Sequence, residues 1–160
     1  MGTVQTEIGA WLTPDEQEAW RAYLATSKLL FRQLDRDLQP FGLSINDYEI
    51  LVVLSESPDH RLRTTDLADA TAQSRSRLSH QITRMEAAGL VRRDSCPGDK
   101  RGLFTVLTDA GLATIERVAP DHVDSVRRHF ISLLTAEQLA AVREGYAAVT
   151  GHLREIRERD

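Results

Sequence analysis

Residues 67–93 read LADATAQSRSRLSHQITRMEAAGLVRR, and this stretch decides the fold. It begins inside a short helix that the sequence predicts over residues 64–71. A tight turn follows, and Ser74 is a good N-cap for a second helix that ends at Gly89. Two short helices joined by a turn of three or four residues are typical of a helix-turn-helix unit.

The second helix of this unit has two different faces. A rotation of about 100° per residue puts Leu78, Ile82 and Met85 on the core side, where Leu67 and Ala68 of the first helix also point. The opposite side carries hydrogen-bonding side chains and no acid between Ser74 and Met85, whereas ordinary surface helices usually interleave charges of both signs. Arginine can donate two hydrogen bonds to one guanine, and serine or threonine can form hydrogen bonds with a base edge or a phosphate. We therefore expect this helix to enter the major groove of double-stranded DNA through Arg75, Ser76, Arg77, Ser79, His80, Thr83 and Arg84.

A β-hairpin with a basic tip is predicted directly after this helix. Residues 90–95 and 103–107 have strand character, and residues 96–102 between them contain Pro-Gly and Gly turn signals. A basic hairpin beside a basic helix suggests a wing that reaches the adjacent minor groove or the DNA backbone. The candidate wing residues are Arg92, Arg93, Asp99, Lys100 and Arg101.

Charge is distributed unevenly along the chain. Residues 60–104 contain nine Arg or Lys and five Asp or Glu, a surplus of four positive charges, although the whole chain carries −4. The remainder therefore carries −8. A basic middle in an acidic frame fits binding to a polyanion, while a solvated charged surface would give the same count.

The rest of the chain is predicted to be helical. Capping signals at Thr13, Ser44, Thr108 and Thr135 each open a helix. We expect a mainly α (α+β) fold: one domain over residues 1–160, with a winged helix-turn-helix at 44–107 and flanking helices at 13–40 and 109–158. The flanking helices carry apolar stripes, which either pack on each other within one chain or form a two-fold interface between two chains.

The chain resembles the MarR family of bacterial transcription regulators. The resemblance rests on residues 67–93, on DKRG at 99–102 and on LTDAG at 107–111, and the flanking helices also match the family plan. It implies a homodimeric repressor or regulator whose first, fifth and sixth helices form the dimer interface. It also implies that Asp99 and Arg101 stabilise the wing while the arginine reaches the minor groove. A two-fold dimer would favour a near-palindromic operator with half-sites roughly 10 bp apart.

The resemblance further implies a small effector, commonly anionic or aromatic, bound between the dimer helices and the reading domain. Such a ligand would release DNA by favouring a spacing of the two DNA-binding helices of the dimer that does not match the major grooves. Candidate pocket residues are Tyr23, Arg32, Tyr48 and His129, although the residue types fit the edge of the core better than a ligand contact.

Several other classes of protein find no support in the sequence. No apolar run could span a bilayer, so we expect no membrane partner, and residues 1–10 do not resemble a signal peptide. The single cysteine, Cys96, cannot form an intramolecular disulfide, and we expect a cytoplasmic protein. No histidine cluster suggests a metal, no cofactor motif is present, and no catalytic motif supports an enzyme. The alternative that stays open is a small-molecule-binding or protein-interaction module that no longer reads DNA.

Overall fold

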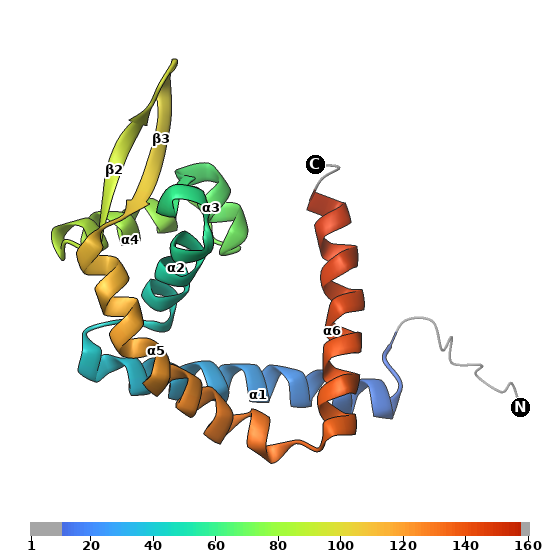
Figure 1. The fold of residues 1–160 in the computed structure, drawn as a ribbon. Coiled ribbons are helices and arrows are strands. Elements are labelled where there is room, and N and C mark those ends of the chain that lie inside the picture. The colour runs from blue at the N-terminus through green and yellow to red at the C-terminus, as the bar shows by residue number, and fades with distance from the viewer. Residues whose placement is uncertain (1–10, 158–160) are drawn as a thin grey trace, which may run out of the picture.

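Six α-helices, three short 3-10 helices (Gln39–Phe41, Pro58–His60 and Ile131–Leu133) and a small antiparallel sheet make up the described part of the protein (Figure 1). The computed structural model describes residues 11–157, apart from the side chains of residues 99–101. The expectation for residues 1–10 lies outside this range, and the single domain over 1–160 stays a prediction. The helices are α1 (Pro14–Leu38), α2 (Ile45–Glu56), α3 (Thr64–Ala70), α4 (Arg75–Ala87), α5 (Asp109–His129) and α6 (Ala136–Arg157). The strands are β1 (Arg61–Arg63), β2 (Val91–Cys96) and β3 (Asp99–Leu107).

Side-chain caps start the helices where the sequence predicted them. Thr13 and Ser44 each form a complete capping box, with Glu16 and Asp47 as the reciprocal partners. Ser74 accepts a hydrogen bond from the backbone of Arg77, and this bond opens α4. Since all these bonds are local, the short-range sequence pattern was sufficient to place the helix starts.

The hydrophobic core lies among α2, α3, α4 and the sheet. The residues predicted to face inward from the helix-turn-helix are confirmed, since Leu67, Ala68, Leu78, Ile82 and Met85 are all buried. The C-terminal end of α1 and the first half of α5 close the core through Leu38, Ile115 and Val118. These contacts hold α4 with its opposite face toward solvent.

The sheet differs from the predicted hairpin in two ways. The expected seven-residue turn is shorter, because Cys96 already pairs with Asp99 and the chain reverses at Pro97 and Gly98. Gly98 adopts a φ of 81°, which favours glycine. The strand β1 was not predicted. It has three residues, too few for a periodic signal, and it pairs with β3 in the order β1-β3-β2.

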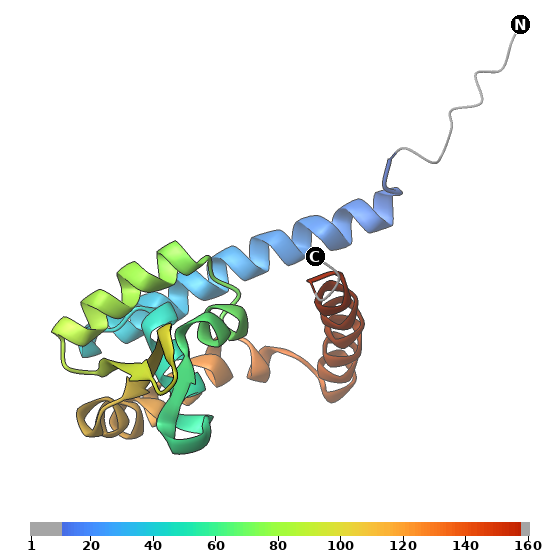
Figure 2. The ribbon, with the colours of Figure 1, turned by 90° about the horizontal axis from the view of Figure 1, so that it is seen from above.

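The helix α6 stands apart from the core, as Figures 1 and 2 both show. Its contacts with the rest of the chain include those of two side chains, Tyr146 and Arg157. The ring centre of Tyr146 lies 5.9 Å from that of Tyr23 on α1, and Arg157 donates a hydrogen bond to Asp69 of α3. Large apolar side chains on α1 and α6 remain exposed, among them Trp20, Phe31, Tyr146, Val149 and Leu153. Within residues 11–157, none of the helices is both long and apolar enough to cross a bilayer.

Candidate nucleic-acid interface

The helix α4 presents one continuous polar face. All seven candidate residues predicted on it are exposed: Arg75, Ser76, Arg77, Ser79, His80, Thr83 and Arg84. The buried Leu78, Ile82 and Met85 lie on the opposite side, as the helical spacing predicted. The first turn of α4 contains no acid, so the positive end of the helix dipole is not neutralised there. The face can approach a polyanion without meeting an exposed carboxylate of its own helix before Glu86.

A pocket joins this face to the start of α2. The side chains that line it come from the first turn of α2 and from the middle of α4, and we call it the α2–α4 pocket. Its residues are Ser44, Asn46, Arg77, His80, Gln81 and Arg84. Three of them, Ser44, Asn46 and Gln81, were not among the sequence-based candidates. The pocket therefore widens the candidate interface from one helix to two.

A buried carboxylate lies beneath the α2–α4 pocket. Asp47 accepts hydrogen bonds from the Ser44 backbone N at 2.9 Å, from Gln81 Nε2 at 3.0 Å and from Arg84 Nη2 at 2.5 Å. Burial alone would raise the pKa of Asp47, but the hydrogen bonds from Ser44, Gln81 and Arg84 outweigh it and hold the pKa below its ordinary value. Asp47 is thus an anion in the folded protein at neutral pH, and it joins α2 to α4.

The wing is joined to α4 through Arg93. Its Nη1 donates to Glu86 Oε2 at 2.6 Å, and its Nη2 donates to the Ser79 carbonyl at 3.0 Å and to Thr83 Oγ1 at 2.9 Å. Arg93 was predicted to contact DNA, but its guanidinium is engaged within the chain and only 23% of its side chain is exposed. This geometry suits a residue that orients the hairpin relative to α4.

The remaining wing candidates are Arg92, next to Arg93 in β2, and residues 99–101 at the start of β3. Arg92 is exposed and pairs with Asp94. The backbone of Asp99, Lys100 and Arg101 forms the start of β3, whereas their side chains lie outside the described residues. On β1, the guanidinium carbons of Arg61 and Arg63 lie 4.9 Å and 6.0 Å from the centre of the Phe104 ring. This second basic cluster was missed because its strand was missed.

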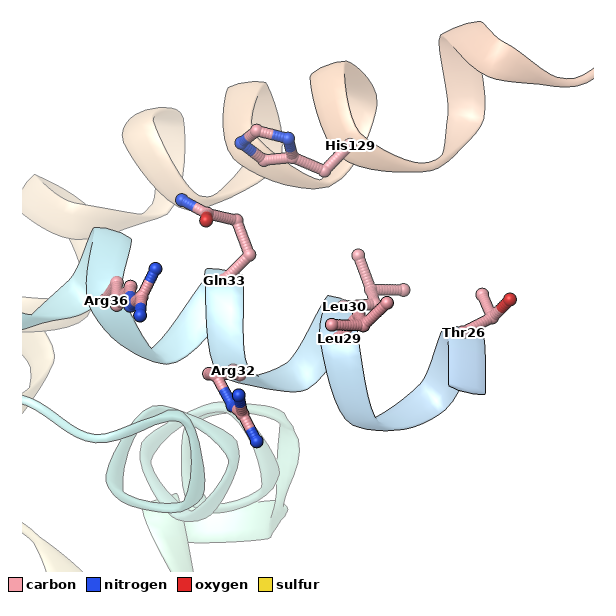
Figure 3. Close-up of a pocket in the computed structure, with 7 residues that line it drawn as sticks. All are labelled: Thr26, Leu29, Leu30, Arg32, Gln33, Arg36 and His129. Atoms are coloured by element: carbon pink, nitrogen blue, oxygen red, sulfur yellow. The ribbon is translucent and has the colours of Figure 1, made fainter. Parts of the chain in front are cut away.

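The four effector candidates do not gather at one place. Arg32 and His129 line a pocket between α1 and α5, which we call the α1–α5 pocket, together with Thr26, Leu29, Leu30, Gln33 and Arg36. In Figure 3, Gln33 points toward His129, whereas Arg32 points away from it. Tyr23 packs instead on Trp20 with ring centres 5.6 Å apart, and Tyr48 is buried against the ring of His122.

His129 has a carboxylate neighbour. Its Nε2 lies 3.3 Å from Asp37 Oδ2, and Ser125 also donates to this carboxylate. The hydrogen bond from Ser125, followed by weaker contributions from Gln33 and His129, outweighs desolvation and lowers the pKa of Asp37. Among the residues that the structure describes, no group of three or more His, Cys, Asp and Glu could hold a metal ion.

Comparisons with known proteins agree with this geometry. The family model described as MarR family matches residues 41–102, which contain the helix-turn-helix and most of the hairpin. The regulator PecS from Dickeya dadantii is 30% identical over 128 residues, covering 79% of this chain and 76% of PecS. The crystal structure of AbsC from Streptomyces coelicolor, a MarR family regulator, has 60% identity and a TM-score of 0.86, covering 91% of this chain and 98% of AbsC. Sco3205 from the same organism, crystallised in complex with DNA, has 46% identity and a TM-score of 0.86, covering 89% of this chain and 90% of Sco3205.

Proposed function

The chain belongs to the MarR family of transcriptional regulators, and on this premise we propose that it binds a specific operator as a homodimer in the cytoplasm. In the proposed complex, α4 enters the major groove and the β2–β3 hairpin lies along the adjacent minor groove. The bound dimer represses its own gene or neighbouring genes. A small anionic or aromatic effector then releases it from a near-palindromic site.

The observation that carries this proposal is the exposed, acid-free face of α4 above a fully buried anchor. Arg77 and His80 project from the same face and line the α2–α4 pocket together with Arg84. A DNA major groove is wide enough for such a helix, and arginine can donate hydrogen bonds to the acceptor atoms of guanine. The DNA complex of Sco3205, at 46% identity, supports DNA binding by this chain.

Exposed apolar side chains support the homodimer. Trp20 and Phe31 on α1 and Val149 and Leu153 on α6 are each more than half exposed in the single chain. Since soluble monomers rarely leave a large contiguous apolar surface uncovered, these helices are suited to meet a second copy. A two-fold pair would hold two α4 helices at a fixed spacing, which is what a near-palindromic operator requires.

The α1–α5 pocket supports a role for an anionic effector. Arg32, Arg36 and the imidazole of His129 offer cationic or hydrogen-bonding groups, and Leu29 and Leu30 offer apolar contacts. The pocket joins α1 to α5, and α5 leads back to the wing. A ligand that binds one relative position of α1 and α5 more tightly than another would shift the protein toward that position. This shift would change the distance between the two α4 helices of the dimer.

Selection of bound duplexes from a random pool, followed by binding titrations on the recovered site, tests the proposal. Wild type should enrich one near-palindromic sequence. Arg77→Ala should weaken binding to it and reduce the slope of log affinity against log salt by about 1 if Arg77 meets a phosphate. Arg117→Ala, at an exposed position on α5, is the matched control and should bind as wild type does. A wild-type chain that enriches no sequence would contradict the proposal and favour a module that no longer reads DNA.

A further inference from the structure

The carboxylate of Asp47 is placed where a DNA-binding surface would not tolerate a free negative charge. It belongs to the first turn of α2, and its side chain is 8% exposed. Arg84 and Gln81, which donate to it, lie on α4, more than thirty residues further along the chain. An uncompensated anion at this depth would repel approaching phosphates and would be costly to bury. The positive charge of Arg84 cancels it.

Arg84 keeps most of its donors free despite this contact. The ion pair engages Nη2, while the side chain remains 64% exposed and lines the α2–α4 pocket. A guanidinium carries five N–H donors in a rigid planar fork, so fixing one edge also fixes the direction of the other. An arginine held in this way loses less side-chain entropy when it meets a base than a freely rotating one does.

We propose that Asp47 is a positioning residue that sets the guanidinium of Arg84 to read one guanine of each operator half-site, without touching DNA itself. This inference rests on the proposed function. Gln81 Nε2 donates to the same carboxylate oxygen of Asp47 as Arg84 Nη2 does. The low pKa of Asp47 keeps this carboxylate charged at neutral pH.

Arg77 provides an internal comparison. It lines the same pocket and lies on the same helix face. Within the described part of the chain, Arg77 has no carboxylate partner comparable to Asp47. Asp47 should therefore couple to Arg84 and not to Arg77, although both arginines face the same DNA groove.

The test is a specificity profile, in which affinity is measured for every single-base change in one operator half-site. Asp47→Asn should lose about ten-fold discrimination or more at one base pair, because a bidentate arginine contact is worth that much. Affinity for random duplex should stay within about two-fold of wild type. Arg84→Ala should lose discrimination at the same base pair, and the double variant should lose no more than Arg84→Ala alone.

Two controls separate positioning from helix capping. Thr13→Ala removes the cap hydroxyl of α1, which does not line the α2–α4 pocket, and leaves the contact between Asp47 and Arg84 in place. It should lower the melting temperature and leave the specificity profile unchanged. Asp47→Asn combined with Arg77→Ala should show additive losses. A uniform loss in Asp47→Asn, with no base pair affected more than the others, would overturn the inference.

A measurement on the wild-type protein does not depend on any variant folding. Nitrogen-15 relaxation of the arginine side chains in the free protein should show Arg84 ordered and Arg77 mobile. Equal mobility of the two side chains would overturn the inference while leaving the proposed function intact. A wild-type chain that selects no sequence overturns the proposed function and this inference together, so the two failures are distinguishable.

Discussion

Arg93 at the start of the wing meets both carboxylate oxygens of Glu86 at the end of α4. Its backbone N donates to Oε1 at 3.0 Å, and its Nη1 donates to Oε2 at 2.6 Å. The same guanidinium reaches back one further turn to Thr83. These bonds set the angle between the hairpin and the proposed reading helix, because they join β2 to α4 on both sides of the turn at Gly89.

We predict that Glu86→Ala destabilises the protein and loosens the wing. Its removal leaves a mostly buried arginine without its charge partner, and hydrogen bonds to charged groups contribute about 1.5–3 kcal/mol. The free energy of unfolding, measured by urea titration, should fall by about this amount. Asp94→Ala breaks the exposed pair with Arg92 and is the control, with an expected change below about 1 kcal/mol. Equal losses in the two variants would show that the contact of Glu86 with Arg93 does not hold the wing.

Gly111 in the first turn of α5 is predicted to tolerate no side chain. A Cβ at this position would lie 2.2 Å from the Leu90 carbonyl oxygen and 2.6 Å from Leu107 Cδ1. Gly111→Ala should therefore cost about 1–3 kcal/mol or more, despite the better helix propensity of alanine. Ala110→Ser adds one atom at the neighbouring exposed position and should change the free energy of unfolding by less than about 0.5 kcal/mol. A wild-type melting curve for Gly111→Ala would mean that α5 can shift away from Leu90.

The parts of the fold that depend on local signals could be predicted from the sequence. Helix starts follow from capping residues, and the inward face of α4 follows from the spacing of Leu78, Ile82 and Met85. The strand β1 could not be predicted in this way, since its pairing of Arg61 with Val106 joins residues far apart in the chain. Three residues carry too little pattern to distinguish a strand from a loop.

The candidate site shows the same difference between local signals, which could be predicted, and contacts between separate elements, which could not. The exposed residues of α4 were predicted because one helix carries them all. The partners of Arg84 and Arg93 lie on other elements, since Arg84 on α4 pairs with α2 and Arg93 on β2 pairs with α4. One signal was available, because Gln81 lies beside Ile82 on the buried side and a buried amide needs a partner. Its partner Asp47 lies three residues after the predicted cap Ser44, and this local pattern gives no link to Gln81. The contact of Arg93 with Glu86 was not predicted, because no local pattern shows that Arg93 folds back onto α4.

The stability of the protein is predicted to fall as the pH drops through about 6.5, in part because of His122 on α5. Its ring packs on Tyr48 at a centroid distance of 4.2 Å, and burial lowers the pKa of His122. The unfolded chain then binds a proton at a higher pH than the folded chain does, so acid favours unfolding in this window. His122→Phe keeps the ring and removes the titration. The loss of unfolding free energy between pH 7.5 and 5.5 should be smaller in this variant, and identical losses would exclude His122 as a contributor.

Leu153 tests the proposed dimer interface most directly. It lies on the stripe of α6 formed with Tyr146, Val149 and Ile156, and it is 55% exposed in the single chain. Because Leu153 is already in contact with solvent there, Leu153→Glu should leave the fold of one chain intact. In a dimer that buries the stripe, the same change places an unpaired carboxylate in an apolar interface, at a cost of several kcal/mol. Sedimentation equilibrium should therefore show a dimer dissociation constant raised by about 100-fold or more.

The matched control lies on the opposite side of the same helix. Ala147 is exposed and points away from the stripe, so Ala147→Glu introduces the same charge without entering the proposed interface. It should sediment as wild type does. Leu153→Glu should also lose most of its affinity for the full operator, because separate chains no longer place two α4 helices on one duplex, while its weak affinity for a single half-site should persist. A wild-type protein that sediments at 18.0 kDa would instead mean that α6 remains uncovered and that one head reads DNA alone.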